Sequence, residues 1–169
     1  KAAALVSKKF VSHEDVENIT GHGDTKSSVV LKNGMACDLR VVTEEQFPYA
    51  LLYFTGSKEH NTAMRGLAKE KGLKLNEYGL FKTKGRKDDE DPRSGELVKC
   101  KTEADIFKVL GLDFVPPEMR ENLGEIELAQ KSKLPVLIEQ EQIRGIFHCH
   151  TTESDGVNSL EEMVAAAQK

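Results

Sequence analysis

Apolar and polar residues follow one another along residues 28–42 in the pattern of a β-hairpin. A first apolar run, Val29 to Leu31, leads into Asn33-Gly34, a pair that tolerates the positive φ angles of a tight turn. On the second strand every other residue is apolar and is expected to lie on one face: Met35, Cys37, Leu39 and Val41. Asp38 and Arg40 are thereby placed together on the opposite face.

Two helices joined by a tight turn are predicted next. Thr43 and Gln46 have the spacing of a capping box, and a helical apolar stripe comes after them: Phe47, Ala50, Leu51 and Phe54. Gly56 ends this first helix, and Ser57 caps a second helix that runs to Gly72. The residues of the second helix that are expected to face a core are Met64, Leu67 and Ala68.

The following segment predicts two strands, at residues 73–82 and 96–101, separated by a polar run at 83–95. That run buries too little apolar surface to order itself strongly, so it is expected to be a mobile hairpin loop. Thr102 caps a short helix that ends at Gly111 and carries three apolar positions, Ile106, Val109 and Leu110.

Pro116-Pro117 then predicts an extended path. Residues 118–142 mix charges with isolated apolar residues, which is typical of a linker. A new strand is predicted from Gln142 to Phe147, followed by a polar segment and by a helix that Ser159 and Glu162 open as a capping box. A strand, a polar loop and a helix in this order form the start of a βα unit.

Composition limits the partners that the chain can have. The chain carries 24 Lys and Arg against 28 Asp and Glu, a formal charge of -4, so it lacks the basic field of a non-specific nucleic-acid binder. Any contact with DNA is expected to be local. A chain of 169 residues can bury one core, or one core and part of a second.

Cysteine usage and hydropathy indicate a cellular compartment. The three cysteines, at 37, 100 and 149, are far apart and form no CxxC pair, which favours a reducing compartment over a disulfide framework. There is no apolar run long enough to cross a membrane. We expect a cytoplasmic protein. A chain that begins without Met and stops inside a helical pattern is expected to be a fragment of a longer protein.

Several groups of residues could carry chemistry. Asp38 taken alone is best explained as a salt-bridged strand carboxylate. Tyr53 to Ser57 place two aromatic rings beside a helix N-terminus, although an ordinary helical hairpin would look the same. Asn61 and Arg65 lie one helical turn apart and could both reach a base edge, or could belong to a solvated face.

The strongest local signal lies at His148-Cys149-His150, which precedes Asp155-Gly156. Two imidazoles one residue apart at the end of a strand point to one side, and imidazole binds zinc and manganese well. The carboxylate of Asp155 on the following turn could join them. A metal site is favoured here over a pair of surface histidines.

Three blocks in order, with Arg65 after the second, resemble the family X DNA polymerases, the polymerase beta family: CDLRVV at 37–42, YFTGSKEHN at 53–61 and LNEYGLF at 75–81. The resemblance implies an α/β (α+β) chain. Residues 1–42 would end the palm, residues 43–117 would form the thumb that closes on the nucleotide, and residues 118–142 would be a linker. IRGIFHCHTTESDG resembles the first motif of a PHP phosphoesterase domain, so residues 143–169 would begin an incomplete (β/α)7 barrel.

The resemblance also assigns roles. Asp38 matches the third palm carboxylate, which binds Mg²⁺ or Mn²⁺. Arg40 would pair with Glu77 and Tyr78 as a closure switch. The residues that would contact the incoming dNTP or DNA are Tyr53, Phe54, Gly56, Ser57, Asn61 and Arg65. Ala36 and Lys58 depart from polymerase beta, so contacts there are not carried over.

In the PHP segment, the first-motif ligands for Zn²⁺ or Mn²⁺ would be His148, His150 and Asp155, with the remaining ligands beyond Lys169. Such domains are associated with 3′-5′ exonuclease or AP-endonuclease activity. The parent protein is expected to add nucleotides to gapped or primer-template DNA in repair, and the fragment alone is expected to be inactive. A stand-alone PHP phosphoesterase and a non-catalytic DNA-binding module are the alternatives.

Overall fold

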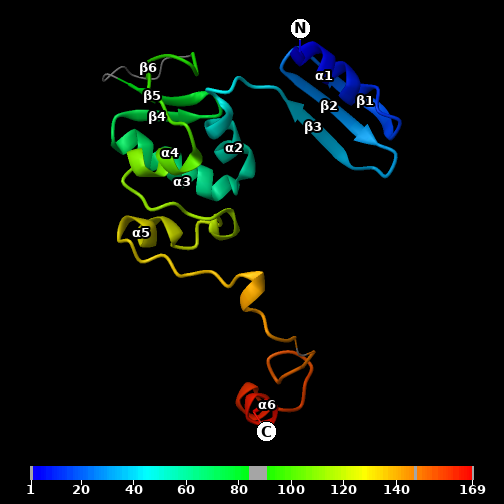
Figure 1. The fold of residues 1–169 in the computed structure, drawn as a ribbon, viewed down its shortest axis with the longest axis vertical. Helices are drawn as coiled ribbons and strands as arrows, with labels where there is room; N and C mark the ends of the chain where they lie inside the picture. Colours follow the sequence, from blue (N-terminus) through cyan, green and yellow to red (C-terminus); the bar gives the residue numbers. More distant parts are fainter. Residues whose placement is uncertain (1, 84–90, 147, 169) are drawn as a thin grey trace. The chain divides into compact units, whose positions relative to one another are not determined.

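The computed structural model describes residues 2–83, 91–146 and 148–168. The chain divides into two compact units, Lys1–Leu134 and Pro135–Lys169, and each is described by itself (Figure 1). The elements of the first unit are a small N-terminal sheet with one helix, and a larger body of helices around a second sheet.

The N-terminal sheet has the strand order β1-β2-β3 and is antiparallel throughout. Its strands are β1 Val16–His22, β2 Lys26–Leu31 and β3 Ala36–Arg40, and helix α1 Ala2–Val11 packs against β1 and β2 (Figure 1). The turn at Asn33-Gly34 is formed as predicted, with Gly34 at a φ of 84° and the Leu31 N–H donating to Met35 O at 2.8 Å. The predicted β-hairpin is therefore confirmed.

The alternation predicted for the second strand of this hairpin also holds. Cys37 and Leu39 are half-buried, whereas Asp38 and Arg40 are exposed. Met35 differs, because it lies in the turn before β3 and is 58% exposed. The carboxylate of Asp38 and the guanidinium of Arg40 thus share the polar face of the edge strand.

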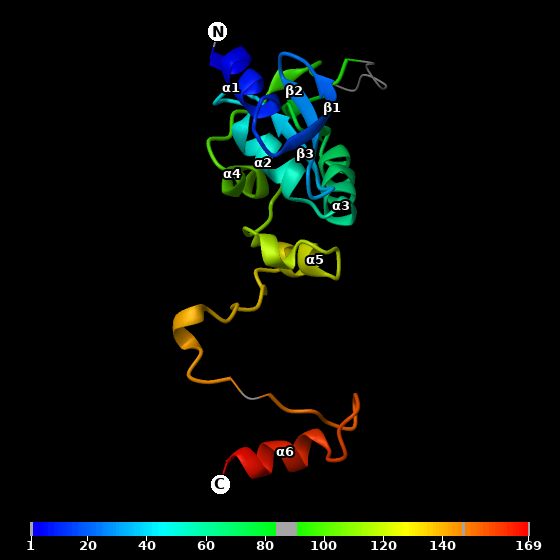
Figure 2. The same cartoon turned by 90° about the vertical axis from the view of Figure 1, so that its right-hand side faces the viewer.

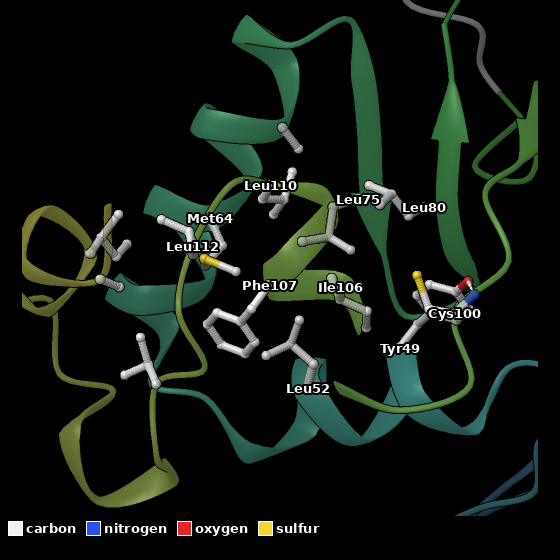
Figure 3. Packing of buried hydrophobic residues seen from close by; sticks show 14 residues of the cluster. Tyr49, Leu52, Met64, Leu75, Leu80, Cys100, Ile106, Phe107, Leu110 and Leu112 are labelled. Carbon is white, nitrogen blue, oxygen red and sulfur yellow. Dashed lines mark hydrogen bonds between the residues drawn. The ribbon is translucent and has the colours of Figure 1, made fainter. Parts of the chain in front are cut away.

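The larger body surrounds one hydrophobic core. Its elements are α2 Phe47–Thr55, α3 Lys58–Glu70, the hairpin β4 Leu73–Asn76 and β5 Gly79–Lys82, the short β6 Glu96–Leu97, and α4 Glu103–Val109. Figure 3 shows Leu52 of α2, Met64 of α3 and Leu80 of β5 converging on Ile106 and Phe107 of α4. Burial of these side chains stabilises the body, at roughly 1.5–3 kcal/mol for each large apolar side chain.

Helix α2 corrects two predictions. It begins at Phe47, with Gln46 as its N-cap, and Thr43 does not cap it; only the Gln46 side chain accepts from the Thr43 N–H. The predicted stripe is confirmed only at Ala50 and was wrong at its three other positions, Phe47, Leu51 and Phe54, which are exposed. The residues buried beside Ala50 are instead Pro48, Tyr49 and Leu52. The helix takes this rotation because the Tyr49 hydroxyl is bound at the edge of the core, to Val98 O and Cys100 N (Figure 3).

Helix α3 agrees with its prediction. The Ser57 hydroxyl accepts from the His60 N–H at 3.2 Å as the N-cap, and Gly72 follows the helix with a φ of 68°. Met64 and Ala68 are fully buried, and Leu67 packs against the same core. Both ends of α3 are therefore determined by the residues that the sequence singles out.

The single strand predicted at 73–82 is instead the hairpin β4-β5, with Glu77-Tyr78 at its turn. Asn76 makes the turn possible, because its Oδ1 accepts from the Tyr78 N–H at 2.9 Å. Gly79 keeps it tight, since a Cβ there would lie 2.6 Å from the Leu97 Cδ1. Of the strand predicted at 96–101 only β6 forms, and most of the predicted 83–95 loop, at 84–90, lies outside the described residues.

The capping of α4 is confirmed, with reciprocal hydrogen bonds between Thr102 and Asp105. Ile106 and Leu110 face the core as predicted, but Val109 is 39% exposed. Pro116 is extended, with φ −59° and ψ 147°, and Pro117 opens a short 3-10 turn, η1 Pro117–Met119.

The linker expected at 118–142 is wrong for its first half. Helix α5 Glu125–Gln130 forms there, and Ile126 and Ala129, one turn apart, are buried in the same core as α4. Arg120 and Glu125 are also buried. A few apolar residues suffice to dock a charged segment when a core already exists to receive them.

The second unit contains the 3-10 turn η2 Gln140–Gln142 and helix α6 Leu160–Ala167 (Figure 2). Helix α6 is opened by the predicted capping box of Ser159 and Glu162. The predicted strand at 142–147 is not formed over residues 142–146, and Phe147 lies outside the described residues. A strand needs a partner to satisfy its backbone, so the expected βα unit is not assembled in this part of the chain. Over the residues that the structure describes, none of the helices has the length and apolar character needed to cross a bilayer.

Replacing Tyr49 with phenylalanine should destabilise the body without changing its packing volume. The Tyr49 hydroxyl donates to Val98 O at 2.5 Å and accepts from Cys100 N–H at 2.9 Å, so its loss leaves two backbone groups without a partner. We expect the free energy of unfolding to fall by about 1–3 kcal/mol. Urea unfolding followed by circular dichroism measures it, with Tyr53→Phe on the same helix as the control. Equal stability of the two variants would contradict the role given to this hydroxyl.

Candidate functional site

The turn between α2 and α3 is the centre of the candidate site. Gly56, with a φ of 76°, ends α2, and the peptide bond to Ser57 is cis. The Ser57 N–H donates to Arg120 O at 2.9 Å, and its hydroxyl accepts from the His60 N–H. Ser57, the N-cap of α3, is therefore held both by its own helix and by the segment that leads into α5.

A surface pocket lies beside this turn. Its lining comes from α2, α3 and β4, and consists of Tyr49, Leu52, Tyr53, Asn61, Arg65, Leu75 and Asn76. Three of the residues singled out from the sequence, Tyr53, Asn61 and Arg65, are thus brought together. The Asn61 side chain donates to Tyr53 O at 2.7 Å, which fixes the amide against the last turn of α2. An aromatic ring, an amide and a guanidinium line one concave surface.

Phe54 lies beside Tyr53 with its ring edge to face, at 5.0 Å between centroids and 80° between planes. Its ring is 51% exposed. The Arg40 guanidinium of β3 lies over Phe54, with its Cζ 5.4 Å from the ring centroid. This is a cation–π contact, an interaction that arginine makes more often than lysine does.

The predicted switch residues are not joined in this structure. Among the interactions of the described residues there is no salt bridge between Arg40 and Glu77, and the ring of Tyr78 is covered by the Arg93 guanidinium at 4.5 Å. The Glu77-Tyr78 pair instead forms the half-buried turn of the β4-β5 hairpin.

Asp38 lies exposed on β3, with the Lys26 ammonium 3.4 Å from its carboxylate. A hydrogen bond from the Ser28 side chain, with smaller effects of Lys26 and Arg40, holds the pKa of Asp38 below its usual value. It is a charged carboxylate with a cation beside it. In the described ranges, however, no three His, Cys, Asp or Glu side chains are grouped to hold a metal ion. Asp38 alone does not make a metal site.

The second unit brings together the other predicted metal ligands. The Nε2 atoms of His148 and His150 lie 2.9 Å apart, and the His150 Nδ1 lies 2.5 Å from Asp155 Oδ1. All three side chains are exposed. They bond to one another, and Asp155 Oδ1 also accepts from the Ser154 hydroxyl at 3.4 Å. In this arrangement the described residues are not a set of ligands converging on one ion.

Residues 50–121 match the family described as DNA polymerase beta thumb. This segment is similar to the thumb of the polymerase beta family. The larger body that it forms together with α5 is called the thumb below. The predicted resemblance is thereby confirmed for the thumb. The Gly56-Ser57 turn, the buried Arg120 and all of the residues that line the pocket except Tyr49 lie within the matched residues.

Curated relatives extend the similarity. The DNA polymerase/3′-5′ exonuclease PolX of Bacillus subtilis is 39% identical over 168 residues, which is 98% of this chain and 28% of that protein. Human DNA-directed DNA/RNA polymerase mu is 44% identical over 84 residues, covering 49% of this chain and 15% of that protein. The chain therefore spans less than a third of the length of either relative.

Solved structures agree. The ternary gap complex of Leishmania infantum polymerase beta is 27% identical, with a TM-score of 0.57, and the match covers 72% of this chain and 52% of that one. The ternary P/T complex of the same polymerase gives a TM-score of 0.55. The aligned part of the chain is thus similar in fold to part of polymerase beta.

The thumb also contains a buried polar pair that the sequence analysis missed. The His60 Nδ1 lies 2.7 Å from the Glu125 Oε1, and the two side chains are only 0% and 3% exposed. The Glu125 carboxylate also accepts hydrogen bonds from two backbone groups, the N–H of Asn122 at 2.9 Å and the N–H of Leu123 at 2.7 Å. Close by, Arg120 pairs with Glu103 at 2.7 Å while it is 1% exposed.

Burial and hydrogen bonding together keep His60 neutral and Glu125 ionised. Burial lowers the pKa of His60 by more than its bond to Glu125 raises it. Burial also raises the pKa of Glu125, but the hydrogen bonds from His60 and from the backbone outweigh it and leave the pKa low. A neutral imidazole with its proton on Nδ1 therefore donates to a carboxylate. Among the described residues the His60 Nε2 has no partner, which agrees with an unprotonated nitrogen at that position.

One signal could have revealed His60. It shares a spacing of four residues with Met64 and Ala68, so it lies on the buried stripe of α3. No comparable signal exists for Arg120 and Glu125, because charged residues in a charged segment are normally solvated. Their burial depends on α5 docking against the core.

Acidification should destabilise the thumb through His60. A pKa lowered in the folded state means that the unfolded state binds more protons below the ordinary value of about 6.5. This contribution to stability is complete above that pH and is lost as the pH falls below it. The lowered pKa of Glu125 acts in the same direction at lower pH.

We expect urea midpoints that are lower at pH 5.5 than at pH 7.5, with the difference reduced in His60→Phe. Phenylalanine keeps a ring of similar size in the core and removes the titrating group. A midpoint difference of the same size in the variant and in the unsubstituted chain would contradict the assignment to His60.

Proposed function

We propose that this chain is part of a family X DNA polymerase that fills short gaps in DNA during repair, transferring a nucleotide from dNTP to a primer 3′-hydroxyl. The observation that supports this most strongly is the pocket that joins Tyr53, Asn61 and Arg65 beside the Gly56-Ser57 turn of a polymerase beta-like thumb. The similarity to polymerase beta in ternary DNA complexes supports gapped or primer-template DNA as the partner.

The pocket side of the turn would bind the incoming nucleotide. The rings of Tyr53 and Phe54, with Gly56 and Ser57, would lie against its sugar. A flat ring and a turn without a Cβ allow the close approach that excludes a ribose 2′-hydroxyl. Their positions at the end of α2 support this role.

Asn61 and Arg65 would test the base pair. They lie one turn apart on α3 and both line the pocket. Their amide and guanidinium donors can reach the minor-groove acceptors that all base pairs share. We place Asn61 against the incoming base and Arg65 against the template strand, so that a mispair would lose these hydrogen bonds.

Asp38 would supply one carboxylate to a Mg²⁺ or Mn²⁺ site in the full-length protein. Its low pKa keeps it ionised at neutral pH, as a ligand must be. Divalent ions in such a site stabilise the charge of a phosphoryl transfer. The described residues hold no complete metal site, so the other carboxylates would come from elsewhere in that protein.

Closure of the thumb would bring Arg40 to Glu77 and Tyr78. In this structure Arg40 contacts Phe54, and Glu77 and Tyr78 lie half-buried at the turn of their hairpin. An arginine that exchanges an aromatic partner for a carboxylate could distinguish two thumb positions.

A second function is supported by the cluster of His148, His150 and Asp155. We propose that these residues belong to the first motif of a PHP domain, in which further ligands would complete a Zn²⁺ or Mn²⁺ site for phosphodiester hydrolysis. Their mutual hydrogen bonds show that the three side chains can approach one another.

Replacing Asp38 with alanine should abolish synthesis by the full-length protein. We expect gap filling with Mn²⁺ to fall on the order of a hundredfold or more, because even the indirect partners of metal ligands cost 10–100-fold. Glu17→Ala is the matched control, since Glu17 is an exposed carboxylate on β1 of the same sheet. The assay is extension of a primer across a one-nucleotide gap.

Undiminished synthesis by the Asp38 variant would show that this carboxylate is structural. Absence of synthesis by the unsubstituted protein, combined with binding to gapped DNA that weakens steeply with salt, would favour a DNA-binding module instead.

Replacing His150 with alanine should lower the bound metal and the 3′-5′ exonuclease activity of the full-length protein and leave gap filling unchanged. His150 bonds both His148 and Asp155, so its loss disrupts the whole cluster. Metal content measured by mass spectrometry and digestion of single-stranded DNA test this. Unchanged metal content would exclude the proposed PHP ligands. His13→Ala, at an exposed histidine of the first unit, serves as the control.

A further inference from the structure

Buried polar groups hold the first turn of α3 on its core side through hydrogen bonds. His60 lies at 0% exposure, and its Nδ1 donates to Glu125 Oε1 at 2.7 Å. The His60 N–H donates to the Ser57 hydroxyl, and the Ser57 N–H donates to Arg120 O at 2.9 Å. Two separate hydrogen bonds thus join the start of α3 to the segment 120–125.

The same turn presents Asn61 to the pocket. The Asn61 N–H donates to Ser57 O at 3.0 Å, and its side chain donates to Tyr53 O. His60 and Asn61 are neighbours in the chain, but one side chain is buried and the other lines the pocket. A movement of the His60 ring therefore changes the position of Asn61.

Apolar packing alone would not require this arrangement. A buried carboxylate needs all of its hydrogen bonds, and Glu125 receives them from His60, Asn122 and Leu123. Such a group tolerates little displacement, because a donor that moves away leaves a charge uncompensated. An apolar contact would allow the helix to slide.

We propose that His60 and Glu125 are positioning residues for nucleotide binding, which fix the first turn of α3 so that Asn61 faces the base of the incoming nucleotide and Tyr53 faces its sugar. This inference rests on the proposed polymerase function. Neither residue touches the nucleotide. They act through the backbone of Ser57 and Asn61.

Two substitutions separate the hydrogen bond from the packing. His60→Phe keeps a ring in the core and removes the donor to Glu125. His60→Asn keeps a donor close to the position of Nδ1 and removes part of the ring. Leu80→Ala, at a fully buried residue of β5, is a control that lowers stability away from the turn.

The experiment measures kcat and KM for dNTP in single-nucleotide gap filling by the full-length protein, at a temperature where each variant is folded by circular dichroism. We expect His60→Phe to raise the KM roughly tenfold, the effect of losing one hydrogen bond to a charged group, with kcat changed less than about twofold. His60→Asn should keep the KM within about threefold of the unsubstituted value. Leu80→Ala should leave the KM unchanged.

A KM that rises in His60→Asn and not in His60→Phe would overturn the proposal, since ring packing would then position the helix. Equal KM values in all variants would overturn it as well. So would a KM that rises in every destabilised variant, Leu80→Ala included.

A second measurement does not depend on catalysis. In the 169-residue chain, amide hydrogen exchange at Ser57 and Asn61 should be roughly tenfold faster in His60→Phe than in His60→Asn. Unchanged exchange in His60→Phe would overturn the positioning role. A full-length protein that performs no synthesis would refute the proposed function, and this exchange measurement would still decide whether the pair holds the turn.

Discussion

The thumb depends on the burial of two charged residues, Arg120 and Glu125, that come late in the sequence and are held by distant partners. Of the polar atoms of these two side chains, the Arg120 Nη2 is buried without a hydrogen-bond partner among the described residues. Arg120 is held by Glu103 and Val115 O, and its guanidinium lies over the rings of Phe107 and Phe114 at 5.2 and 5.4 Å. Glu125 is held by His60 and by two backbone donors. Each charge would destabilise the core if its partners were missing. With them it holds the segment 115–126 against α3 and α4.

The candidate site is held rigid by the same buried residues, Arg120 and Glu125. The Gly56-Ser57 turn is a short connection between two helices, and a turn of this kind is free to vary unless something fixes it. Here the Arg120 carbonyl and the His60 imidazole fix it from the core side, while Asn61 ties it to Tyr53 on the pocket side. The surface that would discriminate nucleotides is thus supported by groups that never reach that surface.

The two units of the chain differ in how much of their structure is self-contained. The thumb buries its own core, with side chains from α2, α3, β4, β5, α4 and α5. The second unit leaves large apolar side chains in solvent, among them Val136, Ile146 and Val157, at 89–92% exposure. Its histidine cluster therefore has no packed framework within the described residues, whereas the thumb pocket has one.

Local chemistry made much of the thumb predictable. The Asn33-Gly34 turn, the Ser57 and Thr102 caps and the Gly72 stop each act through neighbouring backbone, and each is present in the structure. The rotation of α2 was mispredicted, because the Tyr49 hydroxyl chooses the buried face through partners about 50 residues away. The β4-β5 turn was missed since an Asx turn and the close packing of Gly79 replace the usual turn pair.

By itself the sequence determined both ends of α3, the caps that open α4 and α6, the first hairpin and the residues that resemble a polymerase beta thumb, because these depend on residues a few positions apart. Only the tertiary structure decided that the segment 118–134 packs on the core through Ile126 and Ala129 and that His60, Arg120 and Glu125 are buried. Charged side chains enter a core only when distant partners complete their hydrogen bonds. Those partners are 17 and 65 residues away along the chain, at Glu103 for Arg120 and at His60 for Glu125, so no local pattern could show them.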